Sequence, residues 1–121
     1  MPSAGIHRAD SLLGAADRLV QLDDDTVLSA GSFEASLRTA GGAILAVDEV
    51  MAGKAKNAFV AIRLAGHHAE ASTAMGFCLF NNAAVAVRHA QQRYGAERTA
   101  IVDFDAHHGN ARNKSSGVIK G

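Results

Sequence analysis

Asp103, Asp105 and His107 alternate at the end of a segment that begins with the apolar residues Ile101 and Val102. Side chains of an extended chain point alternately to its two faces, so these three polar residues share one face. A carboxylate and an imidazole two residues apart can bind one divalent cation. The alternative is that the Asp-x-Asp carboxylates cap a turn and that the histidines are exposed to solvent. Because the pattern continues as His-His-Gly-Asn, we favour a metal site.

A second polar cluster, Gly66-His67-His68, follows another apolar run. Tandem histidines suit general acid–base chemistry because imidazole titrates near neutral pH. A carboxylate behind an imidazole fixes its tautomer and raises its basicity. Taken alone, a His-His pair is often incidental. It becomes a candidate site if the fold brings it beside the acidic cluster.

A third segment, residues 75–82, is apolar although it lies in an expected loop. It is typical of a pocket wall that contains Phe77. The alternative is that Phe77 and Phe80 fill the core beneath the loop. Cys78 is the single cysteine of the chain, which excludes an internal disulfide framework. We interpret it as a buried small residue rather than a nucleophile.

The first thirty residues have a mixed pattern, and two helices are expected in the first half of the chain. Residues Ser11 to Leu22 predict a short helix, and the acidic run at 23–25 predicts a solvated turn. Ser32 is the expected N-cap of a longer helix, with Glu34 in its first turn and Gly53 just after its end. Its predicted buried stripe consists of Phe33, Leu37, Ala40, Ile44, Val47 and Met51. The glycines at 41 and 42 predict a close packing partner on their side.

The second half predicts a βαβ unit. Ala58 to Arg63 is the first expected strand, and residues 64–80 form the loop that follows it. A helix then begins at Asn81 or Asn82 and ends at Gly95, and residues 99–105 form the second strand. Such a unit implies a parallel sheet covered by helices. Ligands gather beyond the carboxyl ends of parallel strands, where both polar clusters fall.

The charge composition argues against nucleic acid and anionic membranes as binding partners. The 121 residues hold 12 basic and 12 acidic side chains, so the formal charge is zero. A chain without a basic field has no electrostatic attraction for nucleic acid or an anionic membrane. No stretch is apolar for the roughly 20 residues that a bilayer span requires, and the start does not resemble a signal peptide. We therefore expect a cytoplasmic protein.

Three motifs in this order resemble the histone deacetylase superfamily. They are residues 63–70, 75–82 and 101–110, and the similarity runs from about Asp24 to Asn110. The chain is most similar to the class II and bacterial members, which include acetylpolyamine amidohydrolases. The resemblance implies an arginase-like three-layer α/β fold with a parallel sheet. It also implies a zinc-dependent hydrolase that removes acyl groups from lysine, polyamine or small-molecule nitrogen.

The resemblance assigns roles to the residues of the motifs. His67 and His68 would handle the protons of the attacking water and of the leaving amine. Asp103 would pair with His67, and Asn110 would stand behind His68. Asp105 and His107 would be two of three protein ligands to zinc.

The same resemblance also assigns residues to substrate binding and to the binding of a second ion. Phe77 would line the channel for the acyl group, and the carbonyl of Gly76 would meet the substrate amide. The backbone carbonyls of Asp103, Asp105 and His107 would form a structural potassium site.

The similarity does not continue past Asn110, where the family's Gly-Thr-Gln is replaced by other residues. Tyr94, the single tyrosine, lies on an expected helix and does not map to the family's catalytic tyrosine. We therefore expect residues 1–110 to form an incomplete N-terminal portion of the domain and 111–121 to be an unrelated tail. A third zinc ligand is also missing, so the chain alone should be nearly inactive and should bind zinc weakly.

Two other functions compete with this hypothesis. The chain could be a non-catalytic module with weak metal binding. An arginase-like ureohydrolase also uses Asp and His on metals, although the Gly-His-His and Gly-Phe-Cys motifs favour a deacetylase. An incomplete parallel sheet exposes strand edges and apolar helix faces. We therefore expect this chain to form a homo-oligomer.

Overall fold

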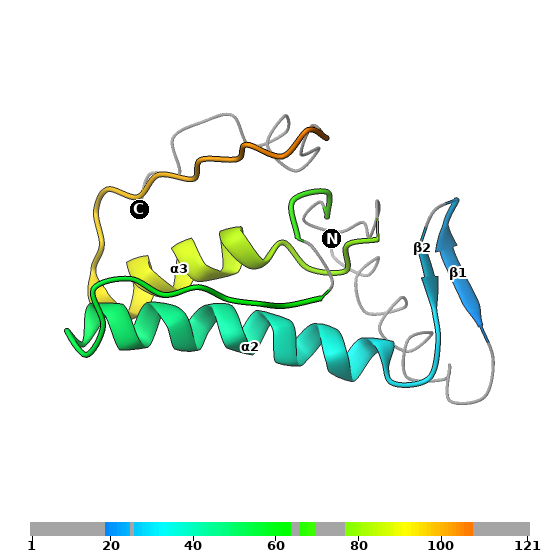
Figure 1. Ribbon diagram of the computed structural model, residues 1–121, viewed down its shortest axis with the longest axis horizontal. Coiled ribbons are helices and arrows are strands. Elements are labelled where there is room, and N and C mark those ends of the chain that lie inside the picture. Colours follow the sequence, from blue (N-terminus) through cyan, green and yellow to red (C-terminus); the bar gives the residue numbers. More distant parts are fainter. Residues whose placement is uncertain (1–18, 25, 64–65, 70–76, 108–121) are drawn as a thin grey trace, which may run out of the picture.

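The computed structural model describes residues 19–24, 26–63, 66–69 and 77–107, and its elements are shown in Figure 1. The chain enters through an antiparallel hairpin of β1 (Val20–Asp23) and β2 (Thr26–Leu28), in which Val20 pairs with Leu28. The expected helix over Ser11 to Leu22 is therefore wrong over residues 19–22, because pairing with β2 outweighs local helical spacing, and residues 11–18 lie outside the described residues. Of the turn predicted over 23–25, Asp24 lies in the hairpin turn, whereas Asp23 belongs to β1 and residue 25 lies outside the described residues.

Helix α2 (Ser32–Met51) has almost the bounds that the sequence predicted. The N-cap is Gly31, at φ 82°, rather than Ser32. Ser32 is instead the first helical residue, and its hydroxyl accepts a hydrogen bond from the Ser29 backbone N–H at 3.0 Å. Gly53 follows the helix at φ 72°, a left-handed conformation that favours glycine, so the predicted stop is confirmed.

The buried face of α2 differs from the predicted apolar stripe. Ser36, Thr39 and Ala43 are its buried residues, whereas Leu37 is 51% exposed. Small residues form this face because an extended segment lies close against it. The Thr39 hydroxyl oxygen is 2.8 Å from the carbonyl oxygen of Arg63. A Cβ on Gly42 would meet Val60 at 3.4 Å, so the close partner predicted beside this glycine is confirmed.

Helix α3 (Asn82–Tyr94) is capped at both ends as the sequence predicted. The Asn81 side chain accepts a hydrogen bond from the Ala84 N–H at 3.0 Å, and Gly95 ends the helix at φ 66°. The two helices pack side by side (Figure 1). Neither described helix is long and apolar enough to cross a membrane.

The two segments that predicted a parallel sheet, 58–63 and 99–105, are extended but are not assigned as strands. Figure 1 shows that both leave the C-terminal ends of the helices and run in the same direction. Phe59, Val102 and Phe104 are 92%, 82% and 94% exposed. The parallel sheet of the predicted βαβ unit is thus not confirmed within the described residues. Apolar β-branched residues favour extended chain, but a ladder also requires a neighbouring backbone in register.

Candidate active site

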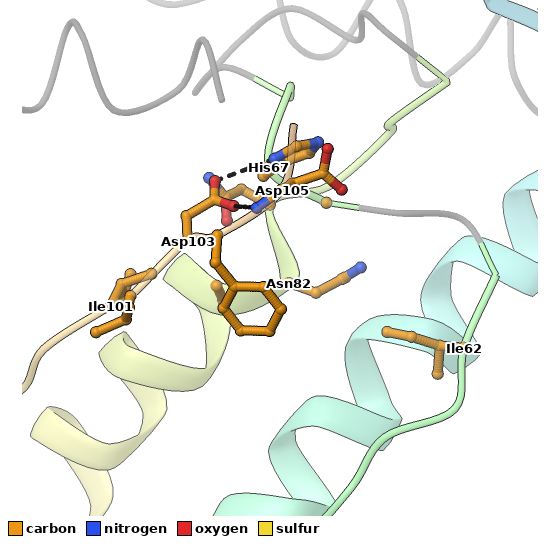
Figure 2. Close-up of a pocket in the computed structure, with 11 residues that line it drawn as sticks. Ile62, His67, Asn82, Ile101, Asp103 and Asp105 are labelled. Carbon is orange, nitrogen blue, oxygen red and sulfur yellow. Dashed lines mark hydrogen bonds and ion pairs between the residues drawn. The ribbon is translucent and has the colours of Figure 1, made fainter. Parts of the chain in front are cut away.

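A cavity of about 380 Å³ lies between the ends of the two extended segments. Its walls are Ile62, Gly66 and His67 on one side and residues 101–105 on the other, with 81–83 at the start of α3 between them. Figure 2 shows Asp103 and Asp105 beside His67 at one end of this cavity. The chain thus brings together two polar clusters that are 36 residues apart in the sequence.

The contact that joins these clusters is between His67 Nδ1 and Asp103 Oδ2, at 3.0 Å. The two side chains are only 21% and 15% exposed, so water screens this interaction less than it would at the surface. An imidazole held in this way has its other nitrogen free to face a substrate. The pairing is the one that the family resemblance implies.

His68 lies against both other histidines of the site. Its ring centroid is 4.1 Å from that of His67 and 6.5 Å from that of His107. Burial lowers the pKa of His68 below the usual value, and the neighbouring imidazoles His67 and His107 lower it further. His68 is therefore neutral near pH 7, the form in which it accepts a proton.

Asp105 and His107 form the exposed end of the site. The Asp105 carboxylate accepts a hydrogen bond from the His107 backbone N–H at 2.8 Å, and its Oδ1 is 3.2 Å from His107 Nδ1. The backbone hydrogen bond is the largest cause of the lowered pKa of Asp105. The Asp105 N–H similarly donates to Asp103 Oδ1 at 3.1 Å. Asp103 and Asp105 therefore cap the turn, as the alternative interpretation predicted, and the same two carboxylates also line the cavity.

The predicted metal ligands are only partly assembled. The side chains of Asp105 and His107 are 51% and 82% exposed. Within 19–24, 26–63, 66–69 and 77–107, no group of three or more His, Cys, Asp or Glu side chains is placed to hold an ion. Among these residues Asp105 and His107 therefore form a donor pair and not a complete metal site.

The aromatic residues of the third motif, Phe77 and Phe80, do not line the described cavity, so the predicted pocket wall is not found there. Phe77 has φ 61° and a side chain that is 64% exposed, and its N–H donates to the Thr26 hydroxyl at 3.2 Å. Phe80 packs against Phe33 of α2 with ring centroids 6.4 Å apart, as the core alternative proposed. Cys78 is fully buried, and burial raises the pKa of its thiol, which disfavours the nucleophilic thiolate. Gly76, Asn110 and the tail at 111–121 lie outside the described residues.

One site residue was missed by the sequence analysis. Asn82 lines the cavity and is only 7% exposed, and a Cβ on Gly66 would lie 2.7 Å from its backbone nitrogen. The glycine before His67 therefore allows the first turn of α3 to approach the tandem histidines. A glycine directly before the tandem histidines allows such an approach, but nothing in the sequence identifies the partner.

The chain belongs to the histone deacetylase domain family, whose profile matches residues 3–116. It is 48% identical over 89 residues to a histone deacetylase-like amidohydrolase of Pseudomonas aeruginosa, covering 74% of this chain and 23% of that protein. It is 46% identical over 78 residues to the polyamine deacetylase HDAC10 of Rattus norvegicus, covering 64% and 13%.

The solved structure of the HDA15 HD domain is similar in fold. It superposes with a TM-score of 0.82 at 37% identity, covering 92% of this chain and 32% of that one. The chain thus spans a quarter or less of the two relatives and about a third of this domain. The described residues are a small α/β part of the deacetylase fold.

Proposed function

We propose that this chain supplies the histidine and aspartate half of the catalytic centre of a zinc-dependent deacetylase. The observation that supports the proposal is the 3.0 Å contact between His67 and Asp103, which joins the two polar motifs at one end of a cavity. Membership of a family of deacetylases and amidohydrolases agrees with this chemistry.

In the proposed reaction His68 takes a proton from the water that attacks the amide carbonyl. Its lowered pKa keeps it neutral and able to do so near pH 7. Asp103 fixes the orientation of His67, which lies 3.0 Å away, and stabilises its protonated form. The proton that His68 has taken then passes to the leaving amine as the amide C–N bond breaks, which returns the histidine pair to its starting state. Asn110 would support His68 in the same way.

Asp105 and His107 are the residues that would hold zinc. Their nearest donor atoms, Oδ1 and Nδ1, are 3.2 Å apart. Two ligands at ~2.0–2.1 Å from one tetrahedral ion are ~3.3 Å apart, so this donor pair fits half of a zinc shell. Bound zinc supplies a Lewis acid that polarises the amide carbonyl. Two exposed ligands bind weakly, so this chain alone should bind little zinc and show little turnover.

The proposed substrates are acylated lysine, acylated polyamine or a small acylated amine. The names of the relatives include a polyamine deacetylase and a histone deacetylase-like amidohydrolase. Phe77 is proposed to line the acyl channel with the Gly76 carbonyl, since its side chain is 64% exposed and free to contact an alkyl chain. The carbonyls of Asp103, Asp105 and His107 are proposed to bind potassium.

The test is a chimera in which the matching residues of this chain replace the 89 residues of the Pseudomonas aeruginosa amidohydrolase. We expect it to deacetylate an acetyl-lysine substrate with zinc bound. His68→Ala should lower kcat by ~10²–10⁴-fold, the usual contribution of a general base. Asp105→Ala should lower the zinc content measured by mass spectrometry.

The matched control is His89→Gln, which changes a histidine of α3 outside the cavity and should leave kcat near that of the chimera. Melting temperatures check that each variant is folded. Full activity in the His68→Ala chimera would contradict the proposal. Zinc binding without turnover in any chimera would instead favour the non-catalytic metal-binding module.

A further inference from the structure

Phe77 has a backbone conformation that its side chain disfavours. Its φ of 61° lies in the left-handed region, which glycine adopts readily and a bulky residue does not. Such a conformation persists only where surrounding contacts hold it. The ring does not supply these contacts, because the Phe77 side chain is 64% exposed. The position of the ring therefore depends on what holds the backbone of Phe77 and its neighbours.

Thr26, the first residue of β2, contacts this backbone directly. The Phe77 N–H donates a hydrogen bond to the Thr26 hydroxyl oxygen at 3.2 Å, across 51 residues of sequence. Side chains alternate along a strand, so Thr26 and Leu28 are buried while Val27 is 52% exposed. Thr26 is only 3% exposed, and water competes little for its hydroxyl. Figure 1 shows the hairpin beside the segment that leads into α3.

The residue after Phe77 is fixed to the tandem histidines. Cys78 is fully buried. Burial raises the pKa of its thiol, while hydrogen bonds from the backbone of His68 and Ala69 lower it. These hydrogen bonds join the backbone beside Phe77 to the segment that contains His68. Phe77 therefore lies between a residue attached to the catalytic histidine and a hydrogen bond to the hairpin.

We propose that Thr26 is a positioning residue for Phe77 and, through the Phe77 ring, for the alkyl chain of the substrate. The inference rests on the proposed function, in which this ring contacts that chain. Without the Thr26 hydroxyl, Phe77 relaxes toward a negative φ, and its exposed ring moves with the backbone. The hairpin contains no residue of the three sequence motifs, yet it thereby affects how strongly a substrate binds.

The first measurement is hydrogen exchange of the Phe77 backbone amide in the full 121-residue chain, followed by nuclear magnetic resonance. Thr26→Val removes the hydroxyl that accepts the hydrogen bond, so exchange of this amide should become ~10-fold faster or more. Thr26→Ser keeps a hydroxyl and should leave the exchange rate within ~3-fold of that of the unchanged chain. Circular dichroism checks folding, and Thr26→Ala takes the place of Thr26→Val if that variant does not fold.

The second measurement is steady-state kinetics in a chimera built to include β1 and β2 of this chain, with an acetyl-lysine substrate. Thr26→Val should raise KM ~3–10-fold, as expected for one lost hydrogen bond, and should change kcat less than ~2-fold. A displaced ring weakens binding of substrate and transition state equally, because the alkyl chain does not react. A general loss of folding would instead lower kcat by removing active enzyme.

Two further variants show whether Thr26 acts through Phe77. In a Phe77→Ala chimera, Thr26→Val should have no further effect on KM, since the ring on which it acts is absent. Val27→Ala is the matched control, because Val27 is the next residue and faces away from Phe77 at 52% exposure. It should leave both the exchange of the Phe77 amide and KM near those of the unchanged chain and chimera.

Unchanged exchange of the Phe77 amide in Thr26→Val would overturn the proposal. An equal acceleration in Thr26→Ser or Val27→Ala would do the same, because the hydroxyl would then not be responsible. In the chimera, a rise in KM that persists in full without the Phe77 ring would show that Thr26 does not act through it. A chimera without turnover would contradict the proposed function alone, since amide exchange in the full chain needs neither zinc nor substrate.

Discussion

A Cβ atom on Gly66 would lie 2.7 Å from the Asn82 backbone nitrogen and 3.1 Å from the Phe80 carbonyl oxygen. Both neighbours are backbone atoms near the start of α3, which cannot rotate away as a side chain would. We therefore expect Gly66→Ala to destabilise the chain by ~1–3 kcal/mol, the usual cost of overpacking. Urea unfolding followed by circular dichroism measures this change.

The matched control for that variant is Gly41→Ala on α2. No atom lies within 4 Å of a Cβ at Gly41. Alanine in a helix interior should stabilise the chain by ~0.5–1 kcal/mol relative to glycine. If both variants changed stability by the same amount and sign, the close contact between Gly66 and α3 would be wrong.

The two helices are joined by one polar network as well as by apolar contact. Asp48 of α2 accepts hydrogen bonds from His89 Nε2 at 2.6 Å and from the Tyr94 hydroxyl at 2.8 Å. The hydrogen bond from His89 is the first cause, and that from Tyr94 the second, of the lowered pKa of Asp48. Hydrogen bonds to a carboxylate favour its charged form. The contribution of this network to the stability of the helix pair therefore depends on pH.

A lowered pKa in the folded state means that the unfolded chain binds the proton first as the pH falls. The stabilisation that the Asp48 network contributes is therefore complete above the ordinary aspartate pKa of ~3.9. It is lost as the pH falls through the lower pKa that Asp48 has in the folded chain. Asp48→Asn should reduce stability at pH 7 and flatten the loss of stability below pH ~4. Denaturant midpoints between pH 2 and 7 measure both effects.

Glu34→Gln is the matched control for Asp48→Asn, because Glu34 pairs with Arg38 on the exposed face of α2. Such surface pairs contribute ~0.3–0.5 kcal/mol, so this variant should change stability little at pH 7. An Asp48→Asn chain with an unchanged acid profile would show that the network between the helices does not contribute to stability.

At the scale of the whole molecule, large apolar side chains are exposed on several surfaces. Leu37 and Leu45 lie on the outer side of α2 at 51% and 59% exposure, and Val102 and Phe104 lie on the wall of the cavity. The zero formal charge gives no repulsion between copies. We therefore expect the chain to self-associate in the absence of other partners.

Light scattering with size-exclusion chromatography at several concentrations measures this association. The average mass should rise with concentration, and Leu45→Glu should lower it by placing charge on the exposed face of α2. A monomer at every concentration tested would contradict the expectation. The cavity wall and the exposed face of α2 are separate surfaces, so comparison of Leu45→Glu with Phe104→Glu shows which of them mediates the association.

The sequence alone determined the features that depend on neighbours along the chain. Helix ends follow from local capping, so Gly53, Asn81 and Gly95 predicted them correctly or within a residue. The chemical types of the site residues were also explicit in the motifs. Their placement in one cavity was expected from parallel strands, although the segments 58–63 and 99–105 form no strands among the described residues.

Only the tertiary structure decided what depends on distant backbone. The buried face of α2 is Ser36, Thr39 and Ala43 because an extended segment presses against it, which no apolar pattern reveals. The two predicted strands are unpaired within the described residues, since a ladder requires partners that local composition cannot provide. The 3.0 Å approach of His67 to Asp103 likewise depends on how two segments, 36 residues apart, lie on the same pair of helices.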